Sequence, residues 1–385
     1  MSFRKLRNIA IRKGAEICWR MPAPFRLVQM LGNSCSLRCV VFHHIAAAPT
    51  PFTSGIRVTV SPGTFENALR FLTKHYVPVT LDDVLSNGDG RGLPPRPVLL
   101  TFDDAYASVA EIGAPLCRQY GVPAVFFVNA AYINNRRLAP DNLVCYVANV
   151  VGMHAVNSAI RAVPGREGAA DHSLAEVFGV FFPTLSLDER DIFLDALCSL
   201  AGMNENRLAQ EENLYLTGDQ LRDLENYGVE VGNHTYSHTH CRSLAHQEIV
   251  AEIERNKAAL EELSGRRVRS FSQPYGSSKD LTRTVADCLR RSGHQAVFLS
   301  ESVANQKNPD LYHLDRVSTC AHNDQSLFFE LEVLPRLRVR RNQLYRDTRP
   351  LRPVQPRSNA GISELSLRRV HNKRINLLGR TREHD

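Results

Sequence analysis

Residues 99–104 read LLTFDD, an apolar strand pattern that ends directly in two adjacent carboxylates, Asp103 and Asp104. The C-terminal ends of parallel strands form the active-site edge of barrels and open sheets, so this pair marks a candidate site. Similar short apolar runs recur along the chain with helical patterns between them, which predicts an α/β fold. These runs cover residues 37–42, 98–102, 124–128, 229–233, 268–271, 295–299 and 314–318.

The composition is that of a globular protein whose two ends differ from its body. The 385 residues are 43% apolar and 23% charged, and no long apolar run predicts a membrane-spanning helix. Seven Lys or Arg and one Glu give residues 1–30 a charge of +6, and fourteen basic against four acidic residues give 336–385 a charge of +10. Since the whole chain carries +7, the body at 31–335 carries −9. An acidic body argues against nucleic acid as a partner.

The two basic ends are predicted to be extensions of one folded domain at 31–335. Residues 1–30 have the pattern of a basic amphipathic helix, which either lies on an anionic membrane surface or packs on the body. Residues 336–385 combine prolines with arginines, as flexible basic tails do. No signal-peptide pattern follows the first charges, so we expect a cytoplasmic protein, with peripheral attachment to the inner membrane face as an option. Nine cysteines without a CxxC pair indicate reduced thiols rather than a disulfide framework or a cysteine zinc site.

One segment interrupts the alternation of strands and helices. Residues 133–216 contain little strand signal and three helical patterns, at 143–156, 174–182 and 187–201. We therefore expect a helical insertion that rises from one of the loops between a strand and the following helix.

A second group of polar side chains follows the predicted strand at 229–233. Residues 234–240 read HTYSHTH, and the four-residue spacing of His234 and His238 puts both imidazoles on one face of a helical turn. Taken alone, an Asp pair after a strand is often a helix cap or turn, and this histidine spacing alone does not establish a metal site. Together, one carboxylate and two imidazoles make a facial ligand set for a zinc-type ion, and the second carboxylate is then free to act as a base.

Several motifs of the chain resemble those of the polysaccharide deacetylases, also described as the NodB homology domain and as family 4 carbohydrate esterases. Residues 101–104 (TFDD) resemble the first motif of that family, 234–238 (HTYSH) its H-S/T-x-x-H motif, and 273–276 (QPYG) its Pro-Tyr motif. Residues 40–43 and 120–128 also resemble strands of the family. The resemblance implies a distorted (β/α) barrel of about seven strands, here with a helical insertion and basic extensions, and a hydrolase of non-peptide carbon–nitrogen bonds.

The same resemblance implies metal-dependent removal of N-acetyl groups from amino sugars of a polysaccharide, an oligosaccharide or a lipid-linked glycan. Asp104, His234 and His238 would bind one divalent metal, usually Zn²⁺. Asp103 would be the general base, and the backbone N–H of Tyr275 would help to hold the oxyanion. An acetamide is a poor electrophile, so a Lewis-acidic ion and a positioned base suit its hydrolysis.

The chain departs from the family pattern in three places. Ala105 replaces the glycine after the aspartates, and Ser272 stands where many members carry an arginine that orients the catalytic aspartate. Arg316 is a candidate substitute for that arginine, with a plain surface arginine as the alternative. The late motif that supplies the general acid is not recognisable; His43, at the end of a predicted strand, is the best-placed candidate, with a buried structural histidine as the alternative. Weaker candidates are His44, His313 and His322, and His240 is expected to face solvent.

Two other functions stay open on the sequence alone. The missing arginine and acid motif favour a non-catalytic carbohydrate-binding protein on the same scaffold, whereas the retained Asp103, Asp104 and histidine pair favour an enzyme. A deacylase of a non-sugar amide would use the same residues. The sequence predicts neither the glycan, nor the preferred metal, nor the oligomeric state.

Overall fold

The computed structural model describes residues 37–86, 92–305, 309–336 and 338. The predicted extension at 1–30 and almost all of the predicted tail at 336–385 lie outside these described residues, so the membrane contact expected of them stays a prediction. Within the described part of the chain, every helix is too short or too polar to cross a bilayer.

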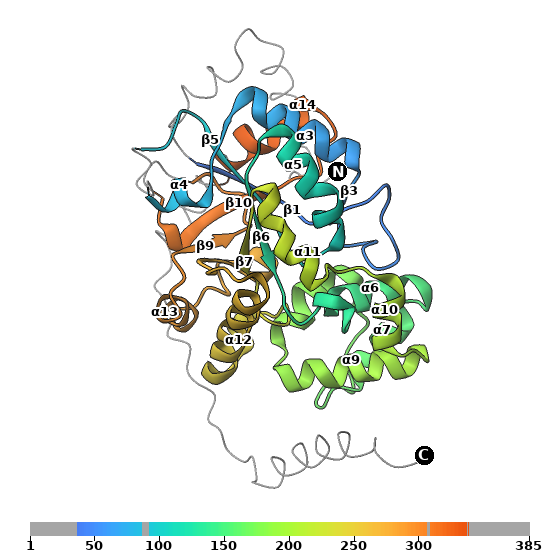
Figure 1. Ribbon diagram of the computed structural model, residues 1–385. Helices are drawn as coiled ribbons and strands as arrows, with labels where there is room; N and C mark the ends of the chain where they lie inside the picture. The colour runs from blue at the N-terminus through green and yellow to red at the C-terminus, as the bar shows by residue number, and fades with distance from the viewer. Residues whose placement is uncertain (1–36, 87–91, 306–308, 337, 339–385) are drawn as a thin grey trace, which may run out of the picture. The chain divides into compact units, whose positions relative to one another are not determined.

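Seven parallel strands close into a barrel at the centre of the structure (Figure 1), as the family resemblance implies. Each strand pairs with the next, and the ring closes because β5 pairs with β1 as well as with β6. In order around the ring the strands are β1 (Arg38–Phe42), β10 (Leu314–Ser318), β9 (Ala296–Leu299), β8 (Ser270–Ser272), β7 (Val229–Asn233), β6 (Ala124–Val128) and β5 (Pro97–Phe102). An eighth strand, β4 (Val77–Pro78), pairs with β5 outside the ring, and β2 (His44–Ile45) pairs with β3 (Thr59–Val60) in a separate small sheet.

Helices surround the barrel, and a second group of helices is inserted between β6 and β7 and lies to one side (Figure 1). The helices around the barrel are α3 (Pro62–His75), α4 (Leu81–Ser86), η1 (Val109–Gly113), α5 (Ala114–Tyr120), α11 (Gly218–Asp223), η5 (Leu224–Tyr227), η6 (Cys241–Ser243), α12 (His246–Ser264), η7 (Pro274–Gly276), α13 (Arg283–Arg291), η8 (Leu311–His313), α14 (Asp324–Phe328) and η9 (Phe329–Val333). The inserted helices are η2 (Ile133–Asn135), α6 (Pro140–Val150), α7 (Met153–Arg161), α8 (Leu174–Glu176), η3 (Val177–Phe181), η4 (Phe182–Thr184), α9 (Leu187–Ala201) and α10 (Glu205–Glu212).

Neighbouring residues of the barrel strands belong to two different apolar cores. Leu100 and Phe102 of β5 pack in one core with Phe65 of α3, on the outside of the ring. Leu99 belongs to a second core together with Phe127 of β6, on the inside of the ring. Successive side chains of a strand point to opposite faces, so a strand buried on both faces needs a continuous apolar run. That requirement explains why the strands read as uninterrupted apolar sequence up to the residue where the site begins.

The helical insertion is present, although one of its helices was predicted wrongly. The pattern at 143–156, expected to be one helix, forms the separate helices α6 and α7. The break falls at Gly152, whose φ of 116° is outside the helical region and is accessible mainly to glycine. Helix α9 agrees with the expected range, and it begins at a capping box formed by Ser186 and Glu189.

The cysteines within the described residues are free thiols, and five of the seven are buried. Burial raises the pKa of Cys39 and of Cys241 to about 12. Such thiols stay protonated near neutral pH, which makes them poor nucleophiles and poor metal ligands.

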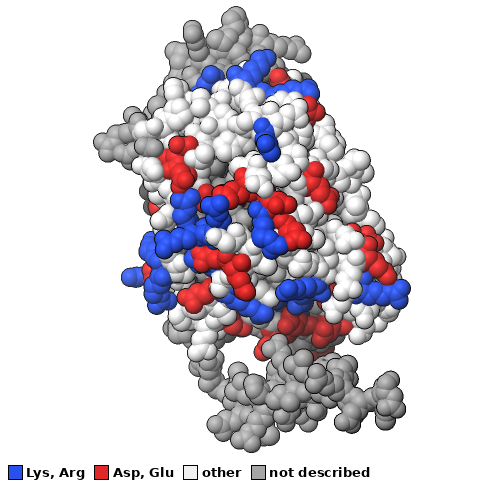
Figure 2. All heavy atoms as spheres, viewed as in Figure 1, with Lys and Arg blue, Asp and Glu red and all other residues white. Residues whose placement is uncertain are grey.

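Both signs of charge are mixed on the surface face shown in Figure 2, where Lys and Arg side chains lie beside Asp and Glu side chains. Opposite charges also pair directly: Arg269 donates to both carboxylate oxygens of Glu230 at 3.0 Å. On this face of the described residues, acidic side chains interrupt the basic ones, whereas a nucleic-acid backbone favours a continuous basic surface.

Candidate active site

The chain leaves β5 through a strained turn that carries the two aspartates. Asp104 and Ala105 both lie in the left-handed region, with φ of 76° and 59°. Residues other than glycine rarely adopt this conformation, and it persists where the surroundings hold it. Here Ala105 is fully buried, and its carbonyl oxygen accepts a hydrogen bond of 3.0 Å from the N–H of Leu216 at the end of the insertion. The alanine therefore keeps the turn that a glycine would make more easily.

The two histidines after β7 converge as predicted, but they do not lie on a helical turn. Residues 234–240 form an irregular loop, in which His238 has a φ of 49°. His234 Nδ1 lies 2.8 Å from the carbonyl oxygen of Ser272, and His238 Nδ1 lies 2.6 Å from Oδ2 of Asp141. These bonds to Nδ1 orient both rings and leave Nε2 as the nitrogen that faces the cluster.

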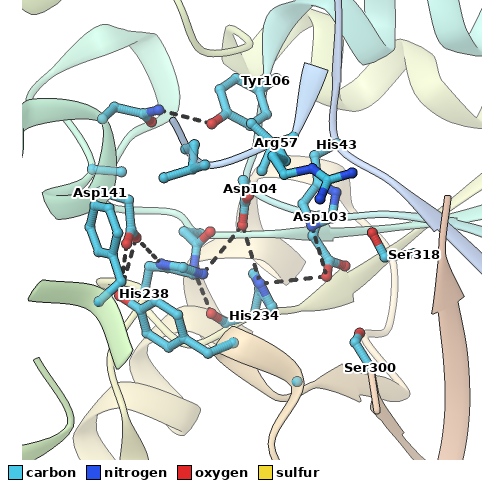
Figure 3. Close-up of a pocket in the computed structure, with 18 of the residues that line it drawn as sticks. His43, Arg57, Asp103, Asp104, Tyr106, Asp141, His234, His238, Ser300 and Ser318 are labelled. Atoms are coloured by element: carbon cyan, nitrogen blue, oxygen red, sulfur yellow. Dashed lines mark hydrogen bonds and ion pairs between the residues drawn. The ribbon is translucent and has the colours of Figure 1, made fainter. Parts of the chain in front are cut away.

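Asp104, His234 and His238 form a cluster with the composition of a metal site (Figure 3). Nε2 of each histidine lies 3.3 Å from Oδ1 of Asp104, and the ligand atoms of the three residues are all within 4.8 Å of one another. That oxygen of Asp104 is buried and accepts no well-formed hydrogen bond. A cation among the three groups would satisfy it, and one carboxylate with two imidazoles is a ligand set that Zn²⁺ accepts.

The charges around this cluster favour bound positive charge. Burial raises the pKa of Asp104, but the imidazoles of His238 and His234 outweigh burial, so the pKa of this carboxyl lies well below its usual value. Burial lowers the pKa of His238, but the carboxylates of Asp141 and Asp104 outweigh burial and raise it to about 9. The cluster therefore attracts a cation, either a proton on His238 or a metal ion in its place.

Arg316, the candidate substitute for the missing arginine, contacts the other aspartate directly. Its Nη1 and Nη2 donate to Oδ1 and Oδ2 of Asp103 at 2.8 and 2.7 Å, a bidentate pair buried in the barrel. Nη2 also donates to Oγ of Ser272 at 2.7 Å. Ser272, which stands where many family members carry the arginine, therefore contacts Arg316, the candidate substitute for that arginine. Burial raises the pKa of Asp103, but Arg316 together with His234 and His43 outweighs burial and lowers it overall. Asp103 is thereby kept ionised.

Of the four histidines considered as general acid, His43 lies next to the cluster. Its Nε2 lies 3.9 Å from Oδ2 of Asp103. Burial lowers the pKa of His43, so the ring is neutral at pH 7. The other candidates do not line this cavity: His44 is bonded to Thr59, whereas His313 and His322 lie on the surface.

Tyr275 is held on three sides. Its backbone is strained, with a φ of 59°, and its hydroxyl donates to both carboxylate oxygens of Asp141 at 3.1 and 3.2 Å. Its ring lies 4.7 Å from that of His238 and stacks on His240 at 3.8 Å with an interplanar angle of 7°. The expectation that His240 faces solvent is wrong: only 6% of it is exposed, because Asp280 holds its Nδ1 at 3.1 Å inside the protein.

All the predicted site residues line one cavity of about 430 Å³ (Figure 3), a size that suits a small ligand or a sugar unit. Its wall combines residues from the barrel loops with Phe178 and Asp141 of the insertion. The predicted site residues in the wall are His43, Asp103, Asp104, His234, His238 and Tyr275.

Comparison with known families agrees with this geometry. The family model described as "Polysaccharide deacetylase" matches residues 90–167 and 181–297, about half of the chain. The chain belongs to the polysaccharide deacetylase family. As a member of this family it is a hydrolase of non-peptide carbon–nitrogen bonds.

A solved deacetylase structure shares the fold of this family member. The Streptococcus pyogenes deacetylase PplD, in complex with acetate, has a TM-score of 0.52 and 14% identity, with 77% of this chain and 98% of that chain covered. IcaB from Ammonifex degensii has a TM-score of 0.47 and 19% identity, over 74% of this chain and 91% of that chain. The likeness to PplD supports the barrel fold.

Three residues of this deacetylase's cavity region escape prediction from sequence. Asp141 comes from the insertion, and its position in helix α6 gives no signal that it reaches His238. Arg57 lies in the loop before β3, which has no recognisable motif. His240 is part of the histidine motif, but its burial depends on Asp280, forty residues further along the chain.

Proposed function

We propose that this protein is a metal-dependent hydrolase that removes N-acetyl groups from the amino sugars of a polysaccharide, an oligosaccharide or a lipid-linked glycan. The observation that carries the proposal is the convergence of Asp104, His234 and His238 beside Asp103 in one cavity. Membership of the family supplies the reaction class, deacetylation of sugars. The cavity supplies the side chains that hydrolysis of an acetamide needs.

Asp104, His234 and His238 would hold one divalent ion, for which we propose Zn²⁺. Bound there, the ion would polarise the acetamide carbonyl and increase the acidity of a water molecule. The contacts of both Nδ1 atoms, with the Ser272 carbonyl and with Asp141, favour the tautomer in which Nε2 offers its lone pair to the ion.

Asp103 is the proposed general base, which takes the proton of the attacking water. Arg316 keeps this carboxylate ionised and fixes its plane, while Oδ2 lies 3.8 Å from Nε2 of the ligand His234. The base is therefore next to the ligand cluster without belonging to it. A positioned base of this kind contributes on the order of 10²–10⁴ in rate.

Tyr275 and His43 would complete the reaction. The backbone N–H of Tyr275 would stabilise the oxyanion that forms when water adds to the carbonyl carbon, a contribution of about 3 kcal/mol. The leaving amine then has to take up a proton. Because His43 starts neutral, it would receive the water proton by way of Asp103 and pass it to the amine.

The alternative of a non-catalytic carbohydrate-binding protein loses its main support. It relied on the absent arginine at Ser272 and on the unrecognised acid motif. Arg316 makes the contact with Asp103 that such an arginine would make, which removes the first of these two reasons. No observation in the described residues favours a non-sugar amide over an acetylated sugar.

Acetate release from N-acetylated chito-oligosaccharides, measured with and without a chelator, tests the proposal. We expect release that the chelator abolishes and that added Zn²⁺ restores. Asp103→Asn should keep the bound ion and lose turnover, whereas Asp287→Asn, a matched change at an exposed aspartate of α13, should keep both. Release that is insensitive to the chelator would disprove the metal dependence, and an ion-loaded protein that releases no acetate would disprove the activity.

We also propose that residues 31–335 form the catalytic domain and that the basic ends attach it to an anionic membrane surface. Flotation of the full chain with anionic liposomes, compared with flotation of a 31–335 fragment, tests the second part. Equal flotation of both would refute a role for the ends.

A further inference from the structure

Arg57 is the only lysine or arginine among the described residues that line the cavity. Its side chain is exposed, and its guanidinium forms no hydrogen bond or ion pair with any described residue. The three carboxylates of the same cavity face other groups, because Asp103 is bound by Arg316, Asp141 by His238, and Asp104 lies against His234 and His238. Arg57 is thus a positive charge at the site that has no ion-pair partner among the described residues.

The loop that carries Arg57 is held against helix α6 of the insertion by hydrogen bonds and a ring stack. Nδ2 of Asn149 in α6 donates to two backbone carbonyl oxygens of this loop, each at 3.1 Å. Phe52 of the loop stacks on Tyr146 of the same helix, with ring centroids 4.7 Å apart and an interplanar angle of 23°. The backbone of the loop around Arg57 is therefore fixed by contacts with α6, although the side chain of Arg57 is exposed to solvent.

The backbone of Arg57 is strained and held from both sides. Its φ of 56° is in the left-handed region, which an arginine adopts at a cost on the order of 1 kcal/mol. Its carbonyl oxygen accepts a contact from Sγ of Cys320 at 3.5 Å, and the next residue, Val58, accepts a hydrogen bond of 3.1 Å from the N–H of His44. These bonds fix the direction in which the side chain leaves the loop, and Figure 3 shows that side chain among the residues around the cavity.

We propose that Arg57 binds an anionic group, a carboxylate or a phosphate, that the substrate carries close to its acetamido sugar. This inference rests on the proposed function and narrows its substrate class to anionic glycans or sugar phosphates. The planar guanidinium pairs with two oxygens of such a group at once, which neutral sugar hydroxyls cannot match. Because the cavity also contains three carboxylates, an anionic substrate would be repelled without this positive charge.

Binding of three probes by the full-length protein tests the inference. The probes are N-acetylglucosamine 1-phosphate, a disaccharide of N-acetylglucosamine and glucuronate, and the uncharged disaccharide N,N′-diacetylchitobiose. Calorimetry would compare the wild type with Arg57→Gln, Arg57→Lys and the matched control Arg283→Gln, which changes an exposed arginine of α13 that has no ion-pair partner among the described residues. Acetate release from the same probes would be followed in parallel.

We expect the wild type and Arg283→Gln to bind one of the two anionic probes about 10-fold more tightly than the neutral one, as charged hydrogen bonds allow. Arg57→Gln should lose this preference, and Arg57→Lys should keep part of it. Whichever anionic probe shows the preference identifies the group as carboxylate or phosphate. Equal binding of all three probes by the wild type, no measurable binding of any of them, or a preference that survives in Arg57→Gln would overturn the inference. Loss of acetate release with an intact preference would instead count against the proposed activity.

Discussion

Replacement of Arg316 tests whether Asp103 is a general base positioned by this arginine or only a buried aspartate paired with it. Arg316→Met removes both hydrogen bonds to Asp103, and it removes those to the hydroxyls of Ser272 and Ser300. Asp103 would then be a buried carboxylate with no basic partner other than histidine side chains, of which His43 Nε2 is 3.9 Å away. We expect this variant to lose both stability and turnover.

The size of both losses follows from the geometry. Breaking a buried ion pair by removing one partner costs about 3–5 kcal/mol, so the free energy of unfolding should fall by that amount. A base that is displaced by about 1 Å and partly protonated should lower kcat by about 10²-fold. The loss of stability alone could reduce turnover, so a variant that restores the pair is needed.

The double variant Ser272→Arg/Arg316→Ser moves the arginine to the strand where many family members carry it. Both residues contact each other and Asp103, so an arginine at position 272 can reach the same carboxylate from β8. We expect the double variant to recover at least 10-fold of the kcat that Arg316→Ser loses, a coupling measured by a double-mutant cycle with acetate release and urea unfolding. If Arg316→Met keeps wild-type kcat in protein that remains folded, Arg316 does not position the base.

Three further predictions concern residues around the site and in the fold. Asp141→Asn should weaken binding of Zn²⁺ by about 10–100-fold in competition with a chromogenic chelator, because it weakens the bond that orients His238; unchanged affinity would contradict this. His240→Ala should lower kcat by about 10-fold with little change in KM, because Tyr275 loses its stacking partner. His240→Phe should retain more of the turnover. An unchanged kcat in both variants would show that the stack has no role. Burial raises the pKa of Glu332, but Arg38 and Arg336 outweigh burial, so the pKa of Glu332 is lowered in the folded protein. The ionised form of Glu332 therefore stabilises the fold above about pH 4.3, and this stabilisation is lost as the pH falls through the folded-state pKa. In urea unfolding, Glu332→Gln should therefore be less stable by about 3 kcal/mol at pH 7 but lose less stability than the wild type between pH 5 and pH 3, and parallel curves would contradict this.

The alternation of strands and helices and the cluster of Asp104, His234 and His238 could be predicted because both depend on local sequence, whereas the closed barrel was implied by the family resemblance. Strands buried on two faces must be continuously apolar, and the polar residues that end them must meet at one edge when the strands are parallel. Asp104 after β5 and His234 after β7 were brought together by that rule alone. The helical turn expected to join His234 and His238 was wrong, since backbone conformations such as the φ of 49° at His238 depend on contacts outside the loop.

The residues that tune the site depend on packing that no local pattern encodes. Periodicity predicts that α6 is a helix, but not that Asp141 in its first turn meets His238, 97 residues away. Burial of His240 requires Asp280 from a different loop. Arg316 was a candidate only because the family's arginine is missing at Ser272. Its pairing with Asp103 joins β10 to the end of β5, and β1 lies between these two strands in the ring.

Zinc K-edge X-ray absorption on the full chain, loaded with one equivalent of Zn²⁺ after removal of bound metals, tests the central claim most directly. The account predicts a single population of zinc with two imidazole nitrogens and carboxylate or water oxygens at about 2.0–2.2 Å, and a decrease from two imidazoles to one in the zinc that His234→Ala still binds. Sulfur scattering at about 2.3 Å, or a fully hydrated ion without imidazole, would contradict it.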